Sequence, residues 1–393
     1  MLELFPKIPA MALGTEAVRA YDRRKGHHYL WLGSLDGEPL LWRVLSKEGN
    51  QAGYQDSEGK AFSGKPLFLL SEYLLGTYFP TGDIRRNFYV YFNRNPEPGW
   101  DLDRPSSVWQ ASDGRTWCGQ FAQACLGPEE RAAVLSTFKS DREYRSKRDA
   151  YNPSLPPFPA APDILNGDQA FFLSAEEAET EEYGFPHRRS YTAESEWWTR
   201  TYEGQVSCSG SHSPEVSIVL TRFGGLLRSP ASPNMKLFAR PALNLDASRV
   251  LFSSLEQAKS RTAPQGAASL MPVPRVRRRR GQTWKLTLRD RSRDGFSLGQ
   301  ARWEGDALVI PYQNAAAYGP SSAPNERISA LITGSGAAVK YYGNIALPLS
   351  PEGEARVRLP KWSRDDRLFV FSEQHNDGGR TDYASPMREV TVP

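Results

Sequence analysis

Residues 112–127, SDGRTWCGQFAQACLG, contain the clearest helical pattern in the chain. Apolar side chains recur at Trp117, Phe121 and Cys125, a spacing of four residues that places them on one face of a helix. The Ser-Asp pair that opens the stretch can cap a helix N-terminus, and the closing glycine marks its end. The next residues, 128–138 (PEERAAVLSTF), begin with proline and two acids, which predicts a second helix.

Short apolar runs bounded by turn residues predict strands on both sides of these helices. A serine at 174 and a glutamate at 177 form a capping box, which predicts a short acidic helix ending near Gly184. Helices and strands together predict an α+β domain over residues 1–257. The strands expected in it are 40–45 (LLWRVL), 66–71 (PLFLLS), 170–174 (AFFLS) and 215–221 (EVSIVLT).

The rest of the chain differs in pattern. Residues 258–282 are polar, small or basic and lack apolar periodicity, so they are predicted to form an exposed Pro/Arg-rich linker. Residues 283–393 contain at least six apolar runs and no helical pattern, which predicts a small all-β sandwich domain of Ig-like type. These runs are WKLTL, ALVIPY, RISALIT, VKYYGNIAL, ARVRL and RLFVF.

Composition excludes several classes of protein. The chain has 393 residues, of which 39% are hydrophobic and 24% charged, and this is typical of a globular protein. A net charge of only +4 does not predict a nucleic-acid partner. The first residues lack the apolar core of a signal peptide, and no stretch has about 18 consecutive apolar residues. We therefore expect no membrane insertion and a cytoplasmic or virion-associated protein.

The titratable residues show no pattern of known chemistry. The five histidines have neither zinc-protease spacing nor a cysteine pair nearby, and no GxSxG motif is present. His27 and His28 follow a basic run and predict a solvated turn, whereas Cys118 and Cys125 are expected to pack inside a helix. A chain without a catalytic pattern predicts no enzyme, and we expect no catalytic residues, cofactor or metal.

Six sequence blocks in order, from about residue 30 to residue 252, resemble a bacterial domain family of unknown function, DUF6273. The resemblance implies a C-type-lectin-like fold, similar to formylglycine-generating enzymes and to the variable proteins of diversity-generating retroelements. It also implies an Ig-like companion module at the C-terminus. The six blocks are 41–45 (LWRVL), 68–72 (FLLSE), 108–112 (VWQAS), 171–174 (FFLS), 197–200 (WWTR) and 238–245 (FARPALNL).

The same resemblance implies which residues support a ligand surface and which form it. The surface would span residues 201–237, between two blocks of framework residues. The expected framework residues are Trp197, Trp198, Arg200, Arg240 and Pro241. The expected ligand-binding residues are Tyr202, Glu203, His212, Arg222, Phe223 and Asn234, a mixture of aromatic, charged and amide side chains that suits recognition.

The resemblance implies a non-catalytic function, the binding of a protein or carbohydrate ligand on a cell surface. In the sharpest form of this hypothesis, a retroelement diversifies the binding face. One alternative is a structural subunit of a phage tail or filament, with the C-terminal sandwich contacting an assembly partner. A second is an oxidase of the formylglycine-generating type. Cys118 and Cys125 count against the oxidase, because that group has its reactive pair near its C-terminal end.

Overall fold

The computed structural model is built mainly of strands, which hold 49% of the residues, whereas 13% are helical. The α+β class that the sequence and the resemblance predict is therefore wrong: the chain is predominantly β. The structure describes residues 7–20, 22, 26–78, 81–92, 108–145, 164–184, 197–208, 211–220, 225–230, 236–255, 268–277, 281–317 and 325–393.

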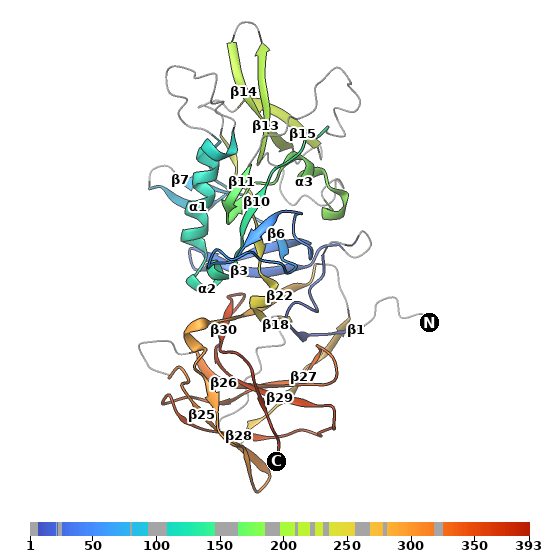
Figure 1. Cartoon of the computed structure of the whole chain (residues 1–393), viewed down its shortest axis with the longest axis vertical. Coiled ribbons are helices and arrows are strands. Elements are labelled where there is room, and N and C mark those ends of the chain that lie inside the picture. The colour runs from blue at the N-terminus through green and yellow to red at the C-terminus, as the bar shows by residue number, and fades with distance from the viewer. Residues whose placement is uncertain are drawn as a thin grey trace, which may run out of the picture. The chain divides into compact units, whose positions relative to one another are not determined.

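The chain divides into two compact units (Figure 1). Unit 2 consists of residues 20–27 and 33–246, and unit 1 consists of residues 1–19, 28–32 and 247–393. Strand β3 (Tyr29–Leu35) begins in unit 1 and ends in unit 2. Unit 1 thus takes in both ends of the chain, whereas the sequence analysis assigns residues 1–257 to one domain.

Unit 2 has three layers of mostly antiparallel strands and one strand pair. The first has the order β12–β17–β6–β4, with β4 (Glu38–Ser46), β6 (Leu67–Ser71), β12 (Ala170–Phe171) and β17 (Ala242–Leu245). The second has the order β11–β10–β5, with β5 (Gly53–Gln55), β10 (Ser136–Lys139) and β11 (Leu165–Asp168). The pair is β7 (Leu75–Tyr78) with β8 (Asp83–Arg86).

The third layer of unit 2 has the order β15–β14–β13–β16–β9 and is antiparallel except where β13 meets β16. Its strands β13 and β14 are the longest in the described part of the chain. The bounds are β9 (Tyr89–Tyr91), β13 (Trp197–Cys208), β14 (Ser211–Leu220), β15 (Gly225–Pro230) and β16 (Lys236–Phe238).

Helix α1 (Asp113–Cys125) forms where the sequence predicts it. The Ser112 hydroxyl caps it by accepting a hydrogen bond from the backbone N–H of Arg115 at 3.0 Å, and its apolar face is buried. Trp117 and Phe121 stack with ring centroids 5.6 Å apart, so this face joins the aromatic core of the unit.

The other helices are short, which is why the α+β prediction fails. Helix α2 (Pro128–Ala133) ends before Val134, which bridges Leu245, and residues 136–139 then pair as β10 instead of continuing the helix. Helix α3 (Ala175–Glu179) begins at the predicted capping box and is followed by the 3₁₀ turn η3 (Glu181–Tyr183). Other single 3₁₀ turns are η1 (Trp109–Ala111) before α1, and η4 (Ala247–Arg249) and η5 (Arg291–Arg293) in unit 1.

In unit 1, the strand pair β1–β21 stands apart from two larger sheets whose side chains share one core. Ile310 and Val357 of one sheet and Ile332 and Val370 of the other are fully buried in it. All six apolar runs predicted beyond residue 282 form strands. They are β22 (Thr283–Arg289), β25 (Ala307–Gln313), β26 (Glu326–Thr333), β27 (Val339–Ala346), β28 (Gly353–Arg358) and β29 (Arg367–Gln374).

Shorter strands complete unit 1. Three of them, β19 to β21, lie inside the segment 258–282 that the sequence analysis predicts as a linker. The shorter strands are β1 (Lys7–Pro9), β2 (Met11–Leu13), β18 (Val250–Leu255), β19 (Ala268–Ser269), β20 (Met271–Pro272), β21 (Arg275–Arg277), β23 (Ser297–Leu298), β24 (Arg302–Glu304), β30 (Asp382–Ala384) and β31 (Arg388–Val390). No helix among the described residues has the length and apolar character needed to cross a membrane.

Candidate functional site

The predicted ligand residues that the structure describes lie on the β13–β14 hairpin of unit 2. The backbone of Tyr202 pairs with Val216, and that of His212 pairs with Ser207. Tyr202 and His212 are therefore offset by five residues along β13, or about 16 Å at the usual rise of a strand. The hairpin carries both positions but does not bring them into one cluster. Arg222, Phe223 and Asn234 lie outside the described residues, as do the side chains of Trp197, Arg200, Tyr202, Glu203 and His212.

The hairpin is irregular around the predicted ligand positions. The register of β13 against β14 shifts between Trp198 and Tyr202, and again between Tyr202 and Gln205. Such shifts are β-bulges or related irregularities, which bend a strand and change the direction of its side chains, and they are frequent near binding sites. Tyr202 and Glu203 thus occupy the part of the hairpin whose pairing is least regular.

The base of the hairpin is fixed by Trp198, the second residue of β13. Its side chain is fully buried, and its indole N–H donates a hydrogen bond to the carbonyl oxygen of Val90 at 2.8 Å. Its ring lies 5.5 Å from that of Phe92, which continues the aromatic core toward Trp109. A tryptophan that is both buried and hydrogen-bonded anchors a strand firmly.

Arg240 and Pro241 connect β16 to β17 and lie beside a buried ion pair. The guanidinium of Arg240 donates to the carbonyl oxygen of Ser71 at 2.7 Å and to the Glu72 carboxylate at 3.2 Å. Arg43 donates to the same carboxylate with both Nε, at 2.9 Å, and Nη2, at 2.6 Å. Both arginine side chains are almost completely buried, so the bidentate Arg43–Glu72 pair and the two contacts of Arg240 lock the connection in place.

His27 lies in this charged environment and not in the solvated turn that the sequence predicts. Both His27 and His28 are buried, so that prediction is wrong. Burial, together with the positive charges of Arg43 and Arg240, lowers the pKa of His27 to about 3. The imidazole therefore remains neutral at physiological pH.

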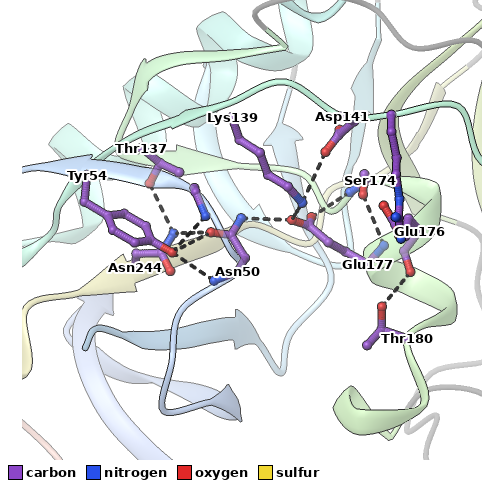
Figure 2. A network of polar contacts seen from close by, with 12 residues as sticks. Asn50, Tyr54, Thr137, Lys139, Asp141, Ser174, Glu176, Glu177, Thr180 and Asn244 are labelled. Atoms are coloured by element: carbon purple, nitrogen blue, oxygen red, sulfur yellow. Dashed lines mark hydrogen bonds and ion pairs between the residues drawn. The ribbon is translucent and has the colours of Figure 1, made fainter. Parts of the chain in front are cut away.

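A buried polar network surrounds the start of α3 (Figure 2). Its centre is Glu177 of α3, whose Oε1 accepts hydrogen bonds from the Asn50 amide at 2.8 Å and the Lys139 ammonium at 2.7 Å. The other oxygen accepts from the backbone N–H of Ser174 at 2.9 Å, while the Ser174 hydroxyl accepts from the N–H of Glu177 at 3.1 Å. This is the predicted capping box, extended by two partners from other elements.

The network continues to β5, to β17 and to Asp141, which follows β10 (Figure 2). Lys139 also forms an ion pair with Asp141 at 3.2 Å. The Asn50 side-chain oxygen accepts hydrogen bonds from the Tyr54 hydroxyl at 3.1 Å and the Asn244 amide at 3.2 Å. Burial raises the pKa of Tyr54, so its hydroxyl stays protonated. The polar groups of the network bind mainly one another.

The network therefore positions α3, and α3 packs against β13, β14 and β15. A buried carboxylate that is neutralised by an ammonium and capped by amides holds its helix in one arrangement. The capping box could be recognised in the sequence because its two residues are three positions apart. Asn50, Lys139 and Asn244 had no such signal, since only the tertiary fold brings them to Glu177.

The cysteines that bear on the oxidase alternative are buried on α1, as predicted. Burial raises the pKa of Cys118 well above its ordinary value and raises that of Cys125 to about 12. Seven residues of helix separate the two by about 10 Å, too far for a disulfide without rearrangement. The thiolate that a reactive cysteine needs is therefore disfavoured at both positions.

Comparison with known proteins adds no name to this site. No family model, curated protein or solved structure matches the chain. The resemblance to DUF6273 stays a prediction. Among the described residues, no group of three or more histidine, cysteine, aspartate or glutamate side chains is placed to hold a metal ion.

Proposed function

We propose that this chain is a non-catalytic recognition protein that binds a protein or carbohydrate ligand through the β13–β14 hairpin of unit 2. The observation that carries the proposal is the combination of a fixed base with an irregular, extended hairpin. Trp198 anchors the start of β13, whereas the register shifts fall at the positions of Tyr202 and Glu203. Ligand surfaces are commonly built in this way, from adaptable segments on a rigid scaffold.

The length of the hairpin supports the same function. Beyond Trp198, β13 continues for ten residues to Cys208, which amounts to about 33 Å of extended chain. Figure 1 shows β13 and β14 running together past the end of α1. Below them, the α3 network and the Arg43–Glu72–Arg240 cluster hold the base of the sheet.

The experiment is a binding screen with a matched pair of variants. The labelled full-length chain is applied to a printed glycan array and, by flow cytometry, to a panel of intact bacterial strains. Each positive signal is repeated with the triple variant Tyr202→Ala, Glu203→Ala and His212→Ala. The control is the triple variant Glu58→Ala, Lys60→Ala and Lys65→Ala, three exposed residues of unit 2 that lie outside the hairpin sheet.

We expect the hairpin variant to lose at least tenfold in affinity, because truncating several contact residues commonly costs more than about 1.4 kcal/mol. The control should bind like the unchanged protein. A hairpin variant that binds as tightly as the control contradicts the proposal, as does a chain that binds nothing on either panel.

The sharper form of the proposal, diversification by a retroelement, has its own test. Sequencing the locus in many isolates should show substitutions at adenine positions in the codons for 201–237, with the framework residues Trp198 and Arg240 unchanged. Substitutions spread evenly over framework and hairpin would contradict diversification while leaving the binding proposal intact.

A further inference from the structure

A small basic ribbon in unit 1 has an arrangement of charge that its own fold does not balance. Strand β1 pairs with β21 so that Lys7 lies opposite Arg277 and Pro9 lies opposite Arg275. Because alternate residues of a strand point to the same side, Lys7, Arg275 and Arg277 share one face. Like charges directly opposite each other destabilise a strand pair, so this register is unfavourable unless a negative charge compensates it.

No described carboxylate pairs with these three cations. The three side chains are exposed, and none forms an ion pair within the described part of the chain; Arg275 donates one hydrogen bond, to the carbonyl oxygen of Lys7 at 3.1 Å. Five other exposed arginines of unit 1 each form an ion pair with a carboxylate. The pairs are Arg289 with Asp294, Arg302 with Glu304, Arg356 with Glu304, Arg358 with Asp306, and Arg367 with Glu389.

A hollow of about 420 Å³ adjoins the ribbon and shares Pro9 and Arg275 with it. Pro272 and Tyr341 give it apolar walls, and the turn at 334–336 also lines it. Lys340 lines it as well, but its ammonium is held by Asp366 at 2.5 Å. The volume is within the range of binding pockets. Apolar walls with a few charged groups suit a side chain of a bound peptide together with the peptide backbone.

We propose that the ribbon and this hollow bind an acidic segment of a partner protein in an extended conformation. Within the described residues, each strand of the ribbon pairs only with the other, so a third strand can add to it through main-chain hydrogen bonds. Glutamate or aspartate at alternate positions of that strand faces the three cations. The intervening apolar side chains extend the half-buried face of Ile8 and Val276 or enter the hollow.

A peptide fits this surface better than a nucleic acid does. The carboxylate of Asp365 lines the same hollow and repels a phosphate backbone, whereas a peptide carries its charges only where the alternation places them. Pairing with a strand also fixes which residues of a peptide face the three cations, whereas contacts to phosphates require no such alignment. The site is separate from the hairpin of unit 2, so it adds a second partner to the proposed function.

The test is fluorescence anisotropy with the full-length chain and two labelled nonapeptides. One alternates Glu with Val, and the other has Gln in place of every Glu; an oligothymidylate of equal charge is the third probe. We expect the Glu peptide to bind, with an affinity that falls as salt concentration rises, and the Gln peptide to bind at least roughly tenfold more weakly. The double variant Arg275→Gln and Arg277→Gln should weaken binding roughly fivefold or more.

The control is the double variant Arg302→Gln and Arg358→Gln, two exposed arginines on other strands of unit 1, which should bind the peptide like the unchanged protein. The single variant Arg277→Gln should keep or raise the melting temperature, because it removes a like-charge pair. Equal binding of the Glu and Gln peptides, or an equal loss in the control, would overturn the proposal. Tighter binding of the oligothymidylate than of the Glu peptide would also overturn it, in favour of a nucleic-acid surface.

Discussion

Two of the buried glutamates, Glu177 in unit 2 and Glu373 in unit 1, are held by different kinds of partner. Glu177 of unit 2 lies against the ammonium of Lys139 and closes a capping box with Ser174. Glu373 of unit 1 accepts hydrogen bonds from two hydroxyls, those of Ser329 at 2.6 Å and Tyr342 at 2.7 Å. The first carboxylate fixes a helix, while the second joins neighbouring strands.

The polar groups around Glu373 connect neighbouring strands of unit 1. Around Glu373, the Asn344 amide donates to the Ser329 hydroxyl at 2.7 Å, so β26, β27 and β29 are tied together on one face. Burial and the charge of Glu373 hold the pKa of Tyr342 well above its ordinary value, which keeps the phenol protonated as a donor. The contacts of Glu177 thus position a short helix, whereas those of Glu373 join three strands.

The largest effect should follow the loss of the cation beside Glu177. Lys139→Met removes one partner of an almost fully buried ion pair and leaves the Glu177 and Asp141 carboxylates without it. Breaking such a pair costs about 3–5 kcal/mol, which urea denaturation followed by tryptophan fluorescence would measure. Lys65→Met is the control, because Lys65 and Glu48 form an exposed pair that is worth less than about 1 kcal/mol. Equal losses in the two variants would mean that the network does not stabilise unit 2.

A smaller effect, visible through pH, tests how unit 2 holds His27. Its pKa is lowered from 6.5 to about 3, so the folded state resists a proton that the unfolded chain accepts. The stability from this group is present above pH 6.5 and is lost as the pH falls toward 3. Between pH 6.5 and 5 the loss is about 2 kcal/mol, at 1.36 kcal/mol for each pH unit.

The measurement is the free energy of unfolding at a series of pH values for the unchanged chain and for His27→Gln. We expect the variant to have a flatter pH dependence over that range by about 2 kcal/mol. His375→Gln, at a half-buried position of unit 1, shows what the loss of an imidazole elsewhere does to the slope. If the slope survives in His27→Gln, the buried imidazole is not its source.

The sequence predicts features that depend on local contacts better than features that depend on residues distant in the chain. Helix α1 and the capping box at Ser174 were predictable because each depends on residues within one or two turns. The length of α2 was not, since residues 136–139 gain more from pairing with β5 and β11 than from continuing a helix. Caps mark where a helix begins but not how far it runs, and three such starts produced the mistaken α+β class.

The candidate site was predictable to a lesser extent. Trp198 and Arg240 are both buried, and their role as a framework for a ligand surface stays a prediction. Their hydrogen-bond partners are distant in sequence. Trp198 is 108 residues from Val90, Arg240 is 169 residues from Ser71, and Arg43 is 29 residues from Glu72, so no spacing rule connects them. Burial of His27 escaped prediction for the same reason, because its environment consists of arginines distant in sequence.

The smallest effect should come from the hydroxyl that joins β27 to Glu373. Tyr342→Phe keeps the ring in its core but removes one donor from the buried carboxylate, which should cost about 1–3 kcal/mol in urea denaturation. Tyr312→Phe is the matched control, since Tyr312 is also buried in unit 1 and burial alone raises its pKa. A loss confined to Tyr342→Phe would show that the carboxylate depends on hydroxyl donors. Equal small losses would mean that Glu373 is satisfied by its other contacts, and the contrast with Glu177 would then be one of geometry and not of energy.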